Sequence, residues 1–126
     1  MKIIKTKINA QDKRGIIRDI LTYVNIDAIT YLTSKKGAVR GNHYHKKTAQ
    51  YDYILKGSCL CYTKLGERGK IKQRILKIGD LALHPPHERH ALKALESLEL
   101  LSLTKGPRRG SSYEKDTYRL ANPLVK

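Results

Sequence analysis

Hydrophobic and polar residues alternate in short runs along most of this 126-residue chain, and turn residues separate the runs. Ile71, Gln73 and Ile75, for example, alternate with the side chains between them. A period of two is typical of strands, whose successive side chains point to opposite faces. We predict strands at residues 2–8, 16–21, 27–33, 39–45, 51–55, 59–64, 71–76, 81–84, 90–95 and 98–103. Roughly nine or ten short strands indicate a β-sandwich or barrel.

The length and the hydrophobic content of 40% suffice for one domain with its own core. After Lys105 the composition changes. Residues 106–112 form a loop, and residues 113–120 form an amphiphilic tail of mixed charge. We expect this tail to lie over the mouth of the barrel or on a partner subunit.

All five histidines lie in two segments, residues 43–45 and residues 84–90. On a strand His43 and His45 share one face, and Gln50 begins the neighbouring antiparallel strand after a turn at residues 46–48. Two imidazoles and an amide oxygen on one concave face make a divalent-metal half-site or a general acid/base pair. His90 is the candidate for a fourth group at this site.

The spacing of these residues resembles the cupin family. Gly37, His43, His45 and Gly57 match its first motif, with Gln50 at the glutamate position. In the second motif Gly79, Pro85 and His90 match, whereas His87 replaces a glycine and Ala94 replaces an asparagine. The resemblance implies an all-β jelly roll, the double-stranded β-helix barrel, with a core at about residues 27–104 and a tail at 105–126. It also implies metal ligands at His43, His45, Gln50 and His90. Residues 91–103 have a helix-forming composition, but the motif favours strands there.

A narrower likeness concerns residues 39–47 and the tail residues 113–119, which are similar to small cupins of surface-polysaccharide pathways. These include nucleotide-sugar 3,4-ketoisomerases and cupin modules fused to sugar-nucleotide reductases. The likeness implies an isomerase or epimerase of a nucleotide-linked sugar, and a homodimer formed through the N-terminal strands. An enzyme is therefore the favoured class. The alternatives are a metal-dependent dioxygenase and a non-catalytic module that binds a sugar or an anion.

The sequence leaves two mechanisms open. Three imidazoles and an amide would leave a divalent ion, such as Zn, Fe, Mn or Ni, with its full charge and strong Lewis acidity. Alternatively, His43 or His45 acts as a general base without a metal, which the resemblance to ketoisomerases implies. Proton abstraction beside a sugar ketone would then give an enediolate.

Further residues are assigned to the substrate side of the site. Arg40 suits a diphosphate, because a guanidinium matches phosphate oxygens. Asp52 shares a face with Gln50 and could orient a histidine. Tyr44 and His84 are also candidate binding residues, and His84 is a substitute ligand for His90. We expect Glu88 and Arg89 to form a solvent-facing turn.

The net charge of +15 is spread along the chain and favours either a phosphate-bearing small-molecule substrate or simply a solvated surface. Nucleic-acid binding is disfavoured, because the charge is not concentrated and no nucleic-acid motif is present.

Cys59 and Cys61 share a strand face and are expected to be buried and reduced. The chain has no secretory signal and no apolar run of membrane-spanning length, so we expect a cytoplasmic protein without membrane contacts.

Overall fold

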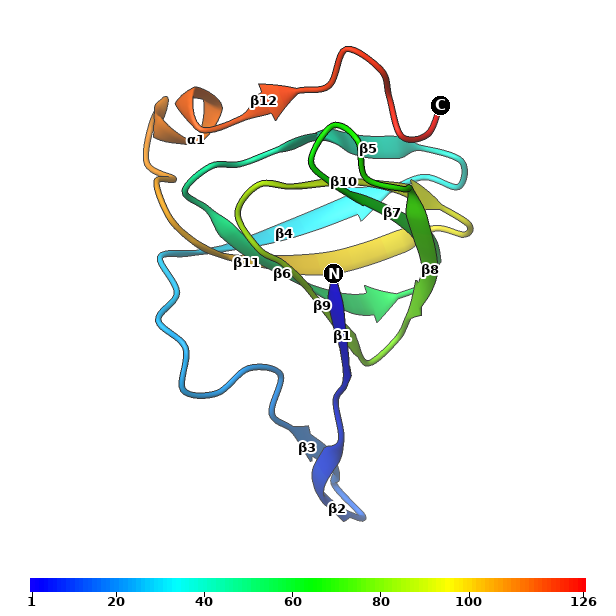
Figure 1. Cartoon of the computed structure of the whole chain (residues 1–126). Coiled ribbons are helices and arrows are strands. Elements are labelled where there is room, and N and C mark those ends of the chain that lie inside the picture. The colour runs from blue at the N-terminus through cyan, green and yellow to red at the C-terminus, as the bar shows by residue number, and fades with distance from the viewer.

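The computed structural model describes residues 1–126 and contains two antiparallel five-stranded sheets packed face to face, together with a separate two-stranded sheet (Figure 1). The first sheet has the strand order β1 (Lys2–Lys5), β9 (Asp80–His84), β6 (Ala49–Lys56), β11 (Leu98–Lys105) and β4 (Ala28–Ser34). The second has the order β12 (Tyr118–Arg119), β5 (Val39–Tyr44), β10 (Glu88–Ala94), β7 (Ser58–Leu65) and β8 (Lys72–Lys77). The predicted all-β jelly roll is therefore confirmed. The single helix, α1 (Ser112–Lys115), lacks the length and the apolar character that crossing a membrane requires.

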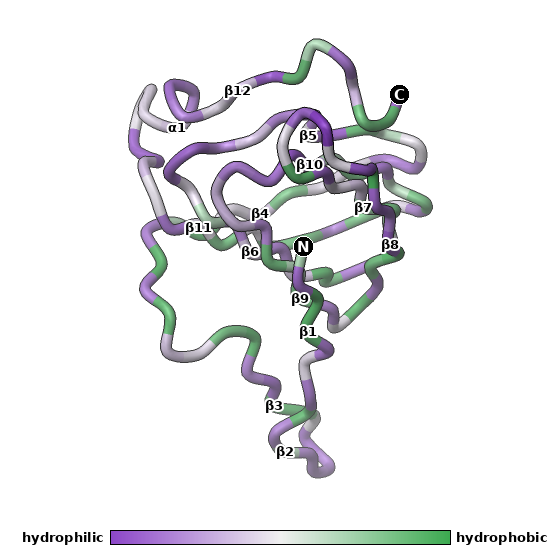
Figure 2. The backbone as a smooth tube through the Cα atoms, in the orientation of Figure 1, coloured by the Kyte–Doolittle hydropathy of each residue, from purple (hydrophilic) through white to green (hydrophobic).

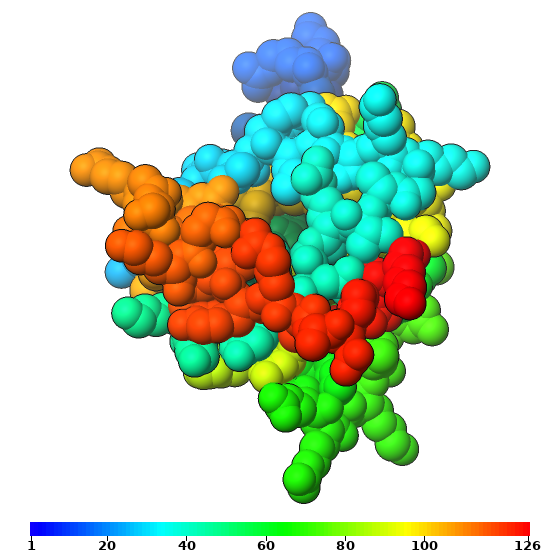
Figure 3. All heavy atoms as spheres, turned by 90° about the horizontal axis from the view of Figure 1, so that it is seen from above, coloured from blue at the N-terminus to red at the C-terminus, as the bar shows by residue number.

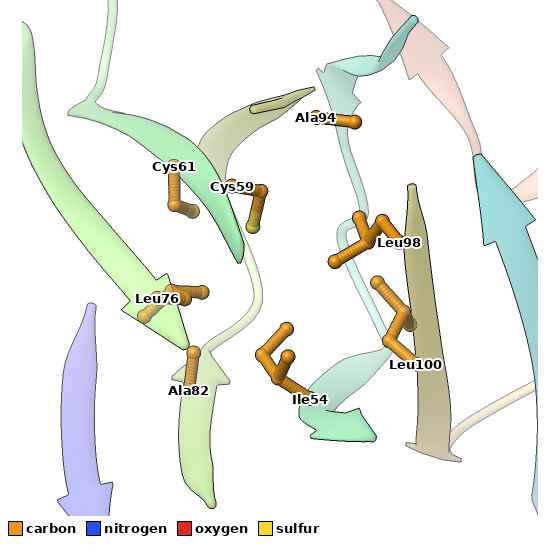
Figure 4. Close-up of a cluster of buried hydrophobic side chains, with 8 residues drawn as sticks. All are labelled: Ile54, Cys59, Cys61, Leu76, Ala82, Ala94, Leu98 and Leu100. Atoms are coloured by element: carbon orange, nitrogen blue, oxygen red, sulfur yellow. The ribbon is translucent and has the colours of Figure 1, made fainter. Parts of the chain in front are cut away.

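The core lies between the two sheets and contains no phenylalanine or tryptophan. Small and branched side chains fill it instead, from strands of both sheets (Figure 4). Its main cluster consists of Ile54, Cys59, Cys61, Leu76, Ala82, Ala94, Leu98 and Leu100. Both cysteines are free and buried, as predicted, and burial raises the pKa of Cys59 to about 12.

The alternation of hydrophobic and polar residues placed the ends of most strands within two residues of their positions in the structure, but the N-terminal strands differ from the prediction. The predicted strand at residues 2–8 is split into β1 and the start of β2 (Ile8–Asp12), which pairs with β3 (Gly15–Arg18). The break falls at Thr6, whose N–H and hydroxyl both donate to the carbonyl of Gly79. These bonds end the pairing of β1 with β9 and direct the β2–β3 hairpin away from the barrel (Figure 1). Residues 91–103 have a helix-forming composition, yet they form the end of β10, a short connection and most of β11, because both strands lie inside sheets.

One irregularity in the second sheet shapes the site. The pairing of β5 with β10 shifts register between His90 and Ala91. Opposite the shift, Gly41 has φ +90°, and a Cβ there would lie 2.8 Å from the carbonyl oxygen of His90. Only glycine tolerates both the backbone conformation and the close approach. The bulge pairs His43 directly with His90.

The C-terminal tail lies across its own barrel, over the second sheet (Figure 3). Helix α1 is followed by β12, in which Tyr118 pairs with Tyr44 of β5. The Asn42 side chain then holds the chain end, because its Oδ1 accepts the N–H of Leu124 at 2.8 Å and its Nδ2 donates to the carbonyl of Val125 at 3.0 Å. Of the two places that we considered for the tail, this is the one over the barrel mouth.

Candidate active site

Three histidines that are distant in sequence converge between the sheets. His43 is the last residue but one of β5, His45 follows that strand on the same face as His43, and His90 lies opposite on β10. The ring centroids are 4.8 Å apart for His43 and His45, 4.8 Å for His43 and His90, and 5.5 Å for His45 and His90. One nitrogen from each ring lies within 4.8 Å of the others. The structure thus brings together three of the four residues predicted as metal ligands.

Backbone carbonyls fix the ring protons of His45 and His90. Nδ1 of His45 lies 2.9 Å from the carbonyl oxygen of Asp116, and Nδ1 of His90 lies 3.2 Å from that of Glu88. A carbonyl can only accept, so each Nδ1 carries a proton and each Nε2 of the neutral ring is left with a lone pair. Both Nε2 atoms are buried and have no hydrogen-bond partner. Buried polar atoms are rarely left unpaired, so these two point to a ligand.

His43 and His90 are uncharged near neutral pH. Burial, with smaller contributions from the charges of His45 and Arg119, lowers the pKa of His43 to about 4. Burial also lowers the pKa of His90 well below its usual value, and the neighbouring histidines add to this effect. Neutral imidazole is the form that can accept a proton or bind a metal.

His84 behaves differently, because it lies between two buried carboxylates. Its Nδ1 is 3.0 Å from Oε1 of Glu88, and its Nε2 is 3.5 Å from Oδ2 of Asp52 and 3.9 Å from Sγ of Cys61. Burial alone would lower the pKa of His84, but these hydrogen bonds outweigh it and raise the pKa well above the usual value. The three nitrogens that lie close enough together for a metal belong to His43, His45 and His90, so the role of His84 as a substitute ligand for His90 stays a prediction. The ring of His84 stacks on that of His90 at 4.8 Å.

The predicted solvent-facing turn at Glu88 was wrong. The Glu88 side chain is 2% exposed and contacts both His84 and the amino group of Met1. Burial raises the pKa of this carboxyl, but the two cationic partners outweigh burial and lower the pKa overall. Glu88 and Arg89 looked like a surface turn, because nothing in the local sequence reveals that distant segments bring the Met1 amino group and His84 to Glu88. Glu88 therefore helps to position His84 beside the other histidines.

Gln50 and Asp52 line the same cavity from β6. Nε2 of Gln50 donates to both Asp52 oxygens, at 3.1 and 3.0 Å. The amide nitrogen is thereby turned towards Asp52, and the ligand role of Gln50 stays a prediction. Asp52 does face a histidine, but that histidine is His84 rather than His43 or His45.

The cavity has an open volume of about 600 Å³, which includes the solvent at its mouth. Its lining combines His43, His84 and His90 with the apolar side chains of three leucines, Leu32, Leu92 and Leu100. Arg40 lies on the lining and is held by bonds of 2.8 Å to Ser34 and to the carbonyl of Thr33. A small organic ligand bearing negative charge would suit this mixture of apolar walls and cations.

Tyr44 lies outside this cavity, so its assignment as a binding residue beside the histidines needs correction. One step along a strand reverses the face, and Tyr44 therefore points away from its neighbours His43 and His45. Its ring stacks on that of Tyr118, with 5.2 Å between the centroids, and the guanidinium of Arg89 lies 4.0 Å from the centroid of the Tyr44 ring.

Two residues of the tail line the cavity and were not singled out from the sequence. The Tyr113 ring lies 5.4 Å from the ring of His45, and the Arg108 guanidinium lies 4.0 Å above the Tyr113 ring. Arg108 also donates to the hydroxyl of Thr30 at 3.1 Å. The resemblance of residues 113–119 to related tails was a signal for this region but not for these contacts.

Asp116 was missed as well, and it attaches the tail to the turn after His45. Its carboxylate accepts the backbone N–H groups of Lys46 and Thr48 at 3.0 Å, that of Lys47 at 3.1 Å, and the Thr48 hydroxyl at 2.8 Å. Burial raises the pKa of Asp116, but these four donors outweigh burial and lower the pKa. The same residue orients His45 through its carbonyl.

No protein-family model matches the chain, and no curated protein matches it. Solved structures match over most of its length. QdtA, a sugar 3,4-ketoisomerase from Thermoanaerobacterium thermosaccharolyticum in complex with TDP, has a TM-score of 0.78 and 25% identity, covering 95% of this chain and 88% of that one.

Two further matches extend the comparison. The TDP-fucose-3,4-ketoisomerase WlaRA from Campylobacter jejuni has a TM-score of 0.76 and 20% identity, covering 92% of this chain and 86% of that one. The dTDP-4-dehydrorhamnose 3,5-epimerase from Sulfolobus tokodaii has a TM-score of 0.74 and 23% identity, covering 86% and 71%. The resemblance stated from the motifs is confirmed at the level of the fold.

Proposed function

We propose that this chain, which has the fold of cupin nucleotide-sugar epimerases and 3,4-ketoisomerases, is an isomerase or epimerase of a nucleotide-linked keto sugar. The observation that carries the proposal is the group of buried histidines, of which His45 and His90 direct unpaired Nε2 atoms away from their carbonyl partners. A wet surface cluster of histidines would not leave such atoms buried.

The chemistry is proton transfer at the carbon beside a ketone. His43 takes that proton. The electron pair of the broken C–H bond forms a carbon–carbon double bond, and the π pair of the carbonyl moves onto the ketone oxygen to give an enediolate. In a 3,4-ketoisomerisation a proton returns to the former ketone carbon, and loss of the hydroxyl proton from its neighbour completes the shift of the ketone. In an epimerisation the proton returns to the first carbon from the other face. The charge of Asp52 favours the imidazolium that forms on His43.

Arg40 and Arg108 are the groups that we assign to the diphosphate. Both line the cavity, and guanidinium groups bind phosphate oxygens in a bidentate manner. QdtA was crystallised with TDP, and one of its variants was crystallised with TDP-4-keto-6-deoxyglucose. A substrate of this chemical class would leave its sugar near the histidines and its phosphates near the arginines.

A divalent ion is the second candidate feature of this site. His43, His45 and His90 could hold one, with Gln50 as a fourth ligand, because their nitrogens lie within 4.8 Å of one another. Two nitrogens on one ion at about 2.1 Å can be separated by at most roughly 4.2 Å, so the widest pair would close slightly. A bound ion would polarise the ketone as a Lewis acid. Zinc, iron, manganese and nickel all accept imidazole ligands.

Solvent exchange tests the function directly. In deuterated water with TDP-4-keto-6-deoxyglucose, we expect deuterium to enter the sugar beside the ketone, as mass spectrometry would record. His43→Gln should abolish the exchange, whereas His87→Asn should retain it, because His87 is exposed and its φ of +72° suits asparagine. No exchange across a panel of nucleotide keto sugars would reject the isomerase and favour a binding module. Oxygen consumption that requires added iron would favour the dioxygenase alternative.

We also propose a homodimer formed through the N-terminal strands. The β2–β3 hairpin leaves Ile16 52% and Ile17 63% exposed, and Ile29 on β4 is 67% exposed. Figure 2 shows the hairpin extending from the barrel with hydrophobic stretches along it. An isolated two-stranded hairpin is marginally stable in water, so a second copy is the expected cover for these side chains.

A further inference from the structure

A second hollow lies on the outer face of the second sheet, away from the histidines. One wall is the loop at residues 65–69 and the other is the chain end at residues 119–124, which lie side by side in Figure 3. Its open volume is about 1160 Å³, including the solvent above it. We call it the outer basic groove, because four of its lining residues are cations: Lys64, Arg68, Arg89 and Arg119.

The positive charge in the outer basic groove is largely unbalanced. Four cations face one lining carboxylate, that of Glu67, which leaves a net charge of +3 (four minus one). Lys64, Arg68 and Glu67 make no ion pair or side-chain hydrogen bond. Arg119 has an acidic partner in Glu114, at 3.1 Å, but both side chains are exposed, where such pairs contribute little. A concave surface with excess positive charge concentrates its field on an incoming anion.

One of the four cations, Arg89, is held in place before any ligand binds. The guanidinium of Arg89 lies 4.0 Å above the Tyr44 ring and donates to the carbonyl of His87 at 2.8 Å. The loop that carries Arg68 is closed tightly, since a Cβ at Gly69 would lie 2.1 Å from the carbonyl oxygen of Leu65. A preformed arrangement costs less entropy when a ligand binds.

We propose that the outer basic groove is a second binding site, for a free multivalent phosphate ligand of the nucleoside-polyphosphate class. Three of its four cations are arginines, whose planar forks match phosphate oxygens. Leu120, Leu124 and Tyr44 supply apolar surface for the part of the ligand that carries no phosphate. A free ligand fits better than a membrane, because the cations line a hollow between two walls that a flat bilayer surface would not enter.

A ligand in the outer basic groove would also stabilise β12, which pairs with the strand that carries His43. Strand β12 has only two residues, and it pairs Tyr118 with Tyr44 and Arg119 with His43. A phosphate chain that contacts both Arg68 and Arg119 would tie the loop to this short strand. Binding should therefore raise the midpoint of thermal unfolding.

The test measures binding of inorganic tripolyphosphate and of ADP by calorimetry. The variant Lys64→Gln/Arg68→Gln is compared with Lys35→Gln/Lys36→Gln, which removes the same charge from an exposed turn. We expect the groove variant to bind both probes roughly tenfold more weakly, whereas the control variant keeps the wild-type affinity.

Three results would overturn this second site. Unchanged affinity in the groove variant would place the probes elsewhere, and equal weakening in both variants would reduce the effect to net charge. Binding to vesicles of anionic lipid, with no binding of the free probes, would assign the groove to a membrane. His43→Gln should retain the binding, so failure of the proposed isomerase activity would leave this site intact.

Discussion

Removal of the Asp116 carboxylate should destabilise the protein and disturb His45 together. Asp116 is 4% exposed and accepts from three backbone N–H groups and one hydroxyl. In Asp116→Ala, water can reach the N–H groups of the exposed Lys46 and Lys47, but Thr48 is 1% exposed and keeps two buried donors without a partner. At about 1–3 kcal/mol for each buried unpaired donor, we expect a loss of about 3 kcal/mol in the free energy of unfolding.

Urea denaturation would measure that loss. Asp116→Asn keeps one acceptor oxygen and should lose about 1–2 kcal/mol. Glu114→Gln, in helix α1 just before Asp116, is the control, because Glu114 is 58% exposed in its pair with Arg119 and should change stability by less than about 1 kcal/mol. The folded state depresses the pKa of Asp116, so its contribution is present above the usual value of 3.8 and is lost as the pH falls through the lowered pKa.

A second measurement separates positioning from simple stability. The ¹⁵N shifts of His45 report which ring nitrogen carries the proton. We expect Nδ1–H in the wild type and a mixture of tautomers in Asp116→Ala. Without its carboxylate, residue 116 is no longer attached to the turn after His45, and its backbone carbonyl, which accepts from Nδ1, is no longer fixed. Wild-type stability together with an unchanged His45 spectrum in Asp116→Ala would refute the reasoning.

Three further predictions concern the metal, the dimer and the core. If the protein purifies with a divalent ion, elemental analysis should find it lost in His90→Ala and retained in His87→Asn; retention in both would end the ligand assignment. Ile17→Lys should convert a dimer into a monomer in sedimentation, whereas Ile78→Lys, a substitution at another exposed isoleucine, should not; equal masses for all three proteins would contradict the proposed interface. Ile54→Ala should cost about 3–4 kcal/mol in urea denaturation, because Ile54 is 0% exposed in the main cluster; a loss below about 1 kcal/mol would show that this core is not tightly packed.

The convergence of His43, His45 and His90 was accessible from the sequence for a simple reason. A period of two places alternate residues on one face, and the glycines and histidines are spaced as in a known family of barrels. The register that pairs His43 with His90 depends on the bulge between His90 and Ala91, which the sequence did not predict. The same alternation places Tyr44 on the outer face, away from the histidines that flank it, so its assignment as a binding residue departed from the rule that located them.

Other parts of the site depend on contacts between residues that are far apart in the chain. Glu88 is buried because β1 and β9 bring the Met1 amino group and His84 to it, and Asp116 lies 68 residues from the Thr48 hydroxyl that it binds. No local pattern encodes such pairs, since a charged residue in a turn reads the same whether its partner is solvent or a distant backbone.

By itself the sequence determined the all-β architecture, the buried cysteines and the three converging histidines, because strand periodicity and motif spacing are local properties. The tertiary structure alone decided that His84 is clamped between two carboxylates, that the tail covers the cavity, and that four scattered cations form one groove. Burial and long-range pairing set the charge and the exposure of those side chains, and both arise only when the two sheets close on each other.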